Sequence, residues 1–174
     1  MKRQTLVAGI GNVFFTDDGF GVEVAARLAR EEAPDGVRVM DAGIRARHLA
    51  FELAGGTYNT AILVDTVKRG GAPGTVYLIE PELPPGSGRQ VDPGFDGHAM
   101  DPAAMLAFLQ TIGGSRTRIL VVGCEPACVD EGMGLTPVVA AAVAEAVVLI
   151  RGLLSEPREL HDGVGSEAGI TGEA

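Results

Sequence analysis

The sequence predicts a three-layer α/β/α sandwich around a mostly parallel twisted sheet of about five strands, one of them antiparallel. Three short runs, at residues 6–10, 61–64 and 118–122, are apolar at nearly every position. Continuous apolar runs of this length are typical of strands that helices cover on both faces. Helical patterns separate these runs, and such alternation of strands and helices is typical of α/β proteins.

The first half of the chain supplies two strand–helix units. The strand at 6–10 ends in a glycine turn, and a helical pattern follows over residues 19–33, with apolar residues at helical spacing. A Pro-Asp-Gly turn separates this helix from a second strand at 37–40, which ends at Asp41. A second helix is predicted from residue 46 to residue 53.

The third strand, at 61–64, ends at Asp65. The link from residue 67 to residue 74 is too short for a crossover helix, which a parallel connection requires. The run at 75–79 is therefore predicted to be antiparallel to its predecessor, at one side of the sheet.

Residues 80–97 form the longest predicted loop, rich in proline and glycine. Loops of this length inside a compact domain are usually functional or mobile. This loop delivers His98 just before Asp101-Pro102, which favour a helix start, and that helix runs to about residue 112. The last strand ends at Gly123-Cys124, and Pro137 opens a final helix.

The composition and charge of the chain limit the kinds of molecule that it can bind. The chain has 174 residues and a net charge of −9, so nucleic acid and anionic membranes are unlikely partners on electrostatic grounds. We expect one domain over residues 1–154, a disordered acidic tail over 155–174, and a monomer when free. No apolar run is expected to reach the length needed to span a bilayer, the N-terminus lacks a signal-peptide pattern, and two cysteines make no disulfide framework. We therefore expect a cytoplasmic protein.

Three metal-ligating side chains are predicted to meet at one edge of the sheet. Asp18 and Asp65 follow the carboxyl ends of the first and third strands, and the long loop carries His98. Ligands of open α/β sheets bind at this edge. Two carboxylates and one imidazole leave coordination positions open, unlike a closed structural zinc site. Spacing alone does not choose between Asp17 and Asp18, and helix capping is the alternative role for these aspartates.

Other chemistries find less support. In Gly9-Ile10-Gly11-Asn12-Val13-Phe14, Phe14 replaces the third glycine of a dinucleotide fingerprint, and the aspartates that follow would repel phosphate. The sequence contains no P-loop, no G-x-S-x-G elbow and no H-E-x-x-H helix. Cys124 and Cys128 have C-x-x-x-C spacing, which is a weak signal for a metal site without a second pair of ligands. We expect no nucleotide or organic cofactor.

Several motifs, in order, resemble those of the nickel-iron hydrogenase maturation endopeptidases. The match spans about residues 4–153. The matching motifs are Gly9-Ile10-Gly11-Asn12, Asp17-Asp18-Gly19-Phe20-Gly21-Val22, Asp41-Ala42-Gly43, Leu63-Val64-Asp65, Gly71-Ala72-Pro73-Gly74-Thr75, His98, Val122-Gly123-Cys124-Glu125-Pro126 and Gly134-Leu135-Thr136-Pro137.

The resemblance implies a protease that removes a short C-terminal extension from the hydrogenase large-subunit precursor after nickel insertion. It implies that Asp18, rather than Asp17, is a metal ligand and catalytic residue, together with Asp65 and His98. The nickel would come from the substrate. Asp41 and Gly43 would help to select the substrate, and many members carry Asp-Gly-Gly-Thr where this chain has Asp41-Ala42-Gly43-Ile44. This departure suggests a different hydrogenase subgroup as client.

Two versions of the cleavage mechanism and one rival class of function remain open. The metal either polarises the scissile carbonyl or activates a water. Alternatively nickel is only a recognition tag, and Asp41 or Asp17 assists a water as general base. The rival is a metal-sensing chaperone that binds the precursor without cutting it.

Overall fold

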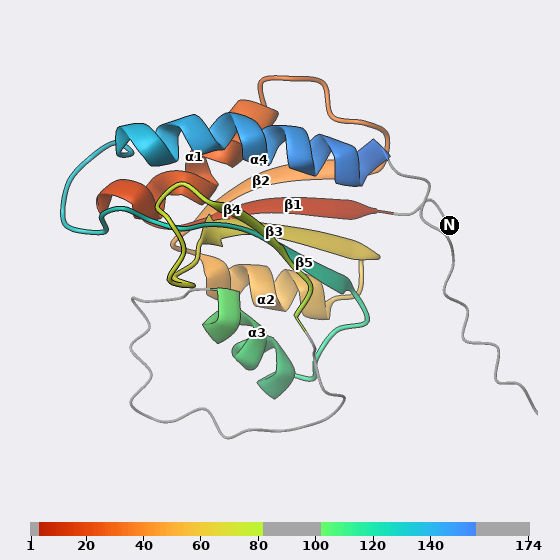
Figure 1. Cartoon of the computed structure of the whole chain (residues 1–174). Coiled ribbons are helices and arrows are strands. Elements are labelled where there is room, and N and C mark those ends of the chain that lie inside the picture. The colour runs from red at the N-terminus through yellow and green to blue at the C-terminus, as the bar shows by residue number, and fades with distance from the viewer. Residues whose placement is uncertain (1–3, 82–101, 156–174) are drawn as a thin grey trace, which may run out of the picture.

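The computed structural model describes residues 4–81 and 102–155, which form a five-stranded sheet between two layers of helices (Figure 1). The strands are β1 (Thr5–Ile10), β2 (Val37–Gly43), β3 (Thr60–Thr66), β4 (Val76–Ile79) and β5 (Arg118–Cys124). The helices are the 3-10 turn η1 (Thr16–Gly19), α1 (Phe20–Leu28), α2 (Ala46–Ala54), α3 (Pro102–Thr111) and α4 (Pro137–Ser155). The predicted fold class is confirmed. His98, most of the predicted 80–97 loop and most of the predicted tail lie outside the described residues.

The sheet has the strand order β2-β1-β3-β5-β4. Neighbouring strands are parallel except β4, which pairs antiparallel with β5 at the edge. The prediction of an antiparallel strand at one side is therefore confirmed. The neighbour of β4 is β5 rather than β3, because β5 takes the place beside β3 along its whole length. Because β1, β3 and β5 are parallel neighbours, their carboxyl ends lie together at one edge of the sheet.

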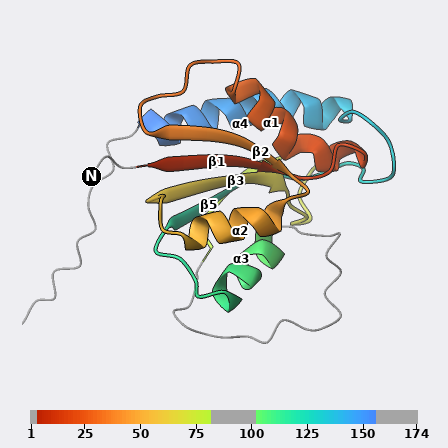
Figure 2. The same cartoon turned by 180° about the vertical axis from the view of Figure 1, so that it is seen from behind.

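Helices α1 and α4 cover one face of the sheet, and α2 and α3 cover the other (Figures 1 and 2). Alternate residues of β1 enter the two cores: Leu6 and Ala8 pack with α2 and α3, whereas Val7 packs with α1 and α4. This alternation follows from the two-residue period of a strand. It explains why the sequence shows continuous apolar runs.

Helix α1 ends at Leu28, not at residue 33 as predicted. Leu28 is the last buried side chain of this segment, and the residues that follow, Arg30, Glu31 and Glu32, are exposed. Continuing the helix would bury no further apolar surface, and most helical stability in proteins comes from such burial.

By length and composition alone, α4 is apolar enough to cross a membrane, contrary to the expectation that no such run exists. Its inner face, which includes Val139, Val143, Ala146 and Ile150, is buried against the sheet. The helix is thus a core element of this domain.

Two glycines bring α1 into direct contact with the sheet. A Cβ atom added to Gly9 would lie 2.1 Å from the Gly21 carbonyl oxygen, and one added to Gly21 would lie 2.1 Å from the Val64 carbonyl oxygen. Any side chain at either position would therefore clash with backbone. These contacts fix the first turn of α1, and with it η1, over the ends of β1 and β3.

Candidate active site

Asp18 and Asp65 come from different loops and meet at the same edge of the sheet. Asp65 is near the end of β3 and is only 3% exposed. Asp18 belongs to η1, which follows β1, and is half-buried. Because β1 and β3 are parallel neighbours, their carboxyl ends lie side by side. The predicted pair of strand-end carboxylates is therefore assembled from segments 47 residues apart (65 − 18).

Thr66 lies between the two carboxylates. Its hydroxyl oxygen is 3.4 Å from Asp18 Oδ1 and 3.5 Å from Asp65 Oδ1. Its backbone N–H donates to Asp65 Oδ1 at 2.6 Å. One residue thus contacts both acids and orients Asp65.

The turn after β1 holds Asp18 from the other side. The Asn12 N–H donates to Asp18 Oδ2 at 2.8 Å. Gly11 has φ +130°, and a Cβ there would lie 1.9 Å from the Asp18 carbonyl oxygen and 3.6 Å from Asp65 Oδ1. A glycine is therefore required for the two loops to approach this closely.

Asp17, the neighbour of Asp18, points into the protein and has 0% exposure. Its Oδ2 accepts hydrogen bonds from the N–H groups of Ala127 and Cys128, each at 2.9 Å, and from the Thr136 hydroxyl at 3.0 Å. Its Oδ1 accepts from the Thr136 N–H at 2.7 Å. Burial alone would raise the pKa of Asp17, but these bonds together lower it. Asp17 therefore ties η1 to the 127–136 loop.

Asp18 opens onto a groove of about 510 Å³ along the same sheet edge. Thr66 lies beside it, and Lys68 and Arg69 follow on the same segment. The remaining lining is mostly apolar: Val67, Ile79, Pro81, Pro102, Leu106, Val121 and Val129. An apolar cleft with a few convergent polar groups is the usual form of a binding site.

Asp41 and Gly43, predicted to contact substrate, lie at the end of β2. Asp41 is exposed, and the Arg45 guanidinium donates to its carbonyl oxygen at 3.0 Å. Gly43 has φ +48°, and its carbonyl oxygen accepts the Gly11 N–H at 3.1 Å. The loop after β2 is therefore attached to the turn that precedes Asp18.

The other predicted ligand, His98, falls in the segment 82–101 and so outside the described residues. Within residues 4–81 and 102–155, no three side chains of the metal-binding types form a cluster. His48 is exposed on α2, as the sequence suggested. Cys124 and Cys128 are free thiols, and burial raises the pKa of Cys124 to about 12, which makes it a poor nucleophile.

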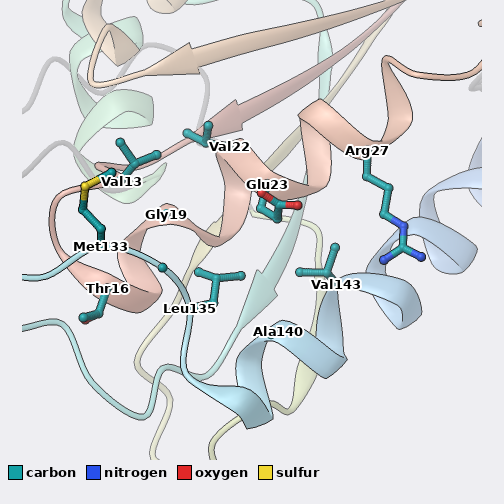
Figure 3. Close-up of a pocket in the computed structure, with 11 residues that line it drawn as sticks. Val13, Thr16, Gly19, Val22, Glu23, Arg27, Met133, Leu135, Ala140 and Val143 are labelled. Atoms are coloured by element: carbon teal, nitrogen blue, oxygen red, sulfur yellow. The ribbon is translucent and has the colours of Figure 1, made fainter.

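A second pocket, of about 320 Å³, is lined by residues of η1, α1 and α4 (Figure 3). Thr16 and Gly19 line it, whereas Asp18, between them in sequence, lines the groove. Met133 and Val13 stand at one end of this pocket, and Glu23 and Arg27 project from α1 (Figure 3). It contains no carboxylate pair, so the groove beside Asp18 is the candidate active site.

Sequence reasoning missed two contributors. Thr66 directly follows Asp65, and its place at a strand end was the available signal. Glu125 is 6% exposed at the end of β5, where its carboxylate holds the backbone of residues 69–70. A glutamate following a buried strand carries no sequence signal that distinguishes this role from capping.

The fold and this edge define an α/β protein with a carboxylate pair at the carboxyl ends of adjacent parallel strands. A family model described as "Hydrogenase maturation protease" matches residues 22–152. The chain therefore belongs to the hydrogenase maturation protease family, and the resemblance read from its motifs is confirmed.

Related proteins agree with this assignment. The hydrogenase 2 maturation protease of Escherichia coli is 30% identical over 169 residues, covering 91% of this chain and 99% of that protein. The coenzyme F420 hydrogenase subunit delta of Methanothermobacter thermautotrophicus is 33% identical over 155 residues, covering 84% of this chain and 92% of that protein. The solved structure of the hydrogenase maturating endopeptidase HybD from E. coli superposes with a TM-score of 0.68 at 27% identity, covering 87% and 91% of the two chains. The chain is thus an enzyme of the protease class.

Proposed function

We propose that this protease removes a short C-terminal extension from a nickel-loaded [NiFe]-hydrogenase large-subunit precursor. The precursor's own nickel would dock onto Asp18, Asp65 and His98. The observation that carries the proposal is the contact of one hydroxyl, that of Thr66, with both carboxylates at the edge of the groove. Carboxylate oxygens and an imidazole nitrogen form a ligand set that leaves room for a metal already bound elsewhere.

Two roles for the substrate's nickel are consistent with this arrangement. As a Lewis acid it would polarise the scissile carbonyl or activate a water. As a recognition tag it would only position the peptide, and a protein carboxylate would then assist the water. Asp17 is a poor base for the second role, because its carboxylate is buried and already accepts four hydrogen bonds. Asp41, which is exposed, is the better placed of the two.

The loop of Asp41 and Gly43 is proposed to help to select the client. It lies at the end of β2 and is bonded to the turn of Gly11, so a substrate in the site would pass near it. Ala42 and Ile44 stand where many members carry glycine and threonine, and Ile44 is 72% exposed. Ile44 is therefore expected to distinguish this client from those of other family members, whereas Ala42 is 2% exposed and packs in the core.

The remaining expectations are part of the proposal. The enzyme would act in the cytoplasm as a monomer when free, on a protein substrate, without nucleic acid, membrane, nucleotide or organic cofactor. The acidic net charge of −9 supports the absence of polyanionic partners.

Mass spectrometry of a nickel-loaded precursor after incubation with the enzyme tests the proposal. A shortened precursor C-terminus is the expected result, and cleavage should be lost with Asp18→Ala or His98→Ala. An intact precursor in a stable complex would instead indicate a chaperone. Normal cleavage by both variants would overturn the proposed site.

A further inference from the structure

The groove beside Asp18 has a basic side formed by Lys68 and Arg69. The chain has 14 basic and 23 acidic residues, and Lys68 is one of only two lysines in the sequence. Both side chains are exposed, and within the part of the chain that the structure describes neither forms an ion pair. Two adjacent cations in the groove of an acidic protein favour an anionic ligand.

The backbone of this basic turn is held by a buried acid. Glu125 accepts hydrogen bonds from the Arg69 N–H at 2.9 Å, the Gly70 N–H at 3.1 Å and the Tyr77 hydroxyl at 3.1 Å. The Arg69 N–H is the main reason why the pKa of Glu125 is lowered, although burial opposes it. Glu125 therefore binds the backbone of this turn, and among the described residues it forms no ion pair with the side chain of Lys68 or Arg69.

Two further residues shape the same turn. A Cβ atom on Gly71 would lie 2.0 Å from the Tyr77 hydroxyl oxygen, so a glycine is needed for Tyr77 to reach Glu125. The Arg69 guanidinium lies 5.7 Å from the centre of the Tyr77 ring, within cation–π distance. The guanidinium of Arg69 is therefore held near an aromatic ring, and its planar set of N–H donors is of the kind that binds carboxylates.

The basic turn is close to the carboxylate pair. Lys68 is two positions after Thr66, which contacts Asp18 and Asp65. Two residues of extended chain span at most roughly 7 Å. Between these ends the groove is lined by apolar residues, among them Val67 and Val121. A peptide bound with its reacting end at Asp18 would reach Lys68 and Arg69 within a few residues.

We propose that Lys68 and Arg69 bind a carboxylate on the C-terminal extension of the precursor and so help to determine substrate specificity. This proposal rests on the proposed function. The carboxylate is either the chain terminus of the precursor or an acidic side chain near the scissile bond. In both cases the apolar part of the groove takes the intervening residues.

Kinetics with nickel-loaded precursor test the proposal. The double variant Lys68→Glu/Arg69→Glu should raise KM about tenfold, because two exposed ion pairs are replaced by repulsion, while kcat stays near the wild-type value. Lys68→Arg with Arg69 retained should keep KM close to wild type. Arg116→Glu is the matched control, since Arg116 is exposed at the opposite end of β5 and carries the same charge. The unfolding temperatures of all variants show whether any change in KM results from a loss of folded protein.

The source of the carboxylate is separated by changing the substrate. A precursor lengthened by two glycines moves the terminal carboxylate, and a precursor with the acidic side chains of its extension changed to amides removes the others. The substrate that lacks the relevant carboxylate should show the raised KM with wild-type enzyme and no further increase with the double variant.

An unchanged KM for the folded double variant, or an equal rise with Arg116→Glu, would overturn the inference and leave the proposed function in place. Absence of cleavage by the wild-type enzyme on every nickel-loaded precursor would overturn both.

Discussion

Asp17 and Asp18 are adjacent and chemically identical, yet they serve two different regions of the molecule. Asp17 is buried and accepts four hydrogen bonds, which join η1 to the 127–136 loop. Asp18 is half-buried, accepts the Asn12 N–H, and lines the groove. A 3-10 turn rotates the chain by about 120° per residue, so consecutive side chains point in different directions. The backbone of η1, and not the residue type, separates structure from proposed chemistry.

The difference also explains why a pair of aspartates is needed here. The internal carboxylate keeps η1 in place against the 127–136 loop, and the external one depends on that position for its contact with Thr66. Exchanging the two roles would require a different turn. Substitutions that change only one of the two aspartates therefore separate folding from activity.

The largest effect is expected for Asp18→Asn. Removing the charge of a proposed metal ligand should lower kcat/KM for nickel-loaded precursor by roughly 1000-fold, in the range seen when a key electrostatic group is lost. The amide oxygen can still accept the Asn12 N–H, so the free energy of unfolding should change by less than about 0.5 kcal/mol. Cleavage assays and chemical denaturation check both values. Wild-type cleavage rates would exclude Asp18 from the site.

Asp17→Asn is the matched control and should have the opposite profile. Its amide group places donors against the Thr136 N–H, and leaving such buried groups unsatisfied should destabilise the protein by about 2–4 kcal/mol. Thermal unfolding would then occur roughly 5–15 °C lower. A stability equal to that of wild type would show that Asp17 does not hold the 127–136 loop.

Thr66→Val should produce a moderate effect on activity. Loss of the hydroxyl removes its contacts with Asp18 and Asp65. Mutation of residues that orient metal ligands typically lowers metal affinity or activity by about 10- to 100-fold, so we expect about a tenfold decrease in kcat/KM. Thr66→Ser restores the hydroxyl and should recover most of the activity. If serine and valine gave equal losses, the hydroxyl would not be the positioning group.

The smallest effect is a pH dependence of stability. The pKa of Asp17 in the folded protein is lowered from its ordinary value of 3.8, so its stabilisation is present above that pH and is lost as the pH falls through the lowered value. The difference in unfolding free energy between wild type and Asp17→Asn should therefore be largest above about pH 4 and shrink on acidification. Denaturant titrations between about pH 2.5 and about pH 6 measure it. A difference that grew at lower pH would contradict this role of Asp17.

Much of the fold follows from sequence because each strand carries its own apolar run and each helix its own turn signal. The continuous runs of β1, β3 and β5 predicted a sheet covered on both faces, and the short link before β4 predicted an antiparallel edge strand. The sequence did not reveal that β4 pairs with β5, since a link length limits direction but not the choice of neighbour. It also overextended α1, because charged residues after Leu28 continue a helical pattern without burying anything.

The candidate site was less accessible to sequence reasoning. Strand-end position identified Asp18 and Asp65, since parallel strands bring their carboxyl ends together. The distinction between Asp17 and Asp18 required family resemblance, because a turn of four residues sets side-chain directions that spacing does not encode. Thr66 and Glu125 escaped notice because their contacts join segments that are 48 and 56 residues apart. The assignment of His98 to the site remains a prediction.

The close contact between Gly9 and Gly21 has a consequence for relatives of this chain. These glycines are demanded by backbone contact, so any sequence that folds this way must keep them whether or not it cuts a precursor. A relative that retained both glycines and Asp17 but lacked the neighbouring aspartate would keep the architecture while losing the proposed ligand. Among uncharacterised relatives, the residue at position 18 is thus the one to inspect first when sorting proteases from inactive descendants.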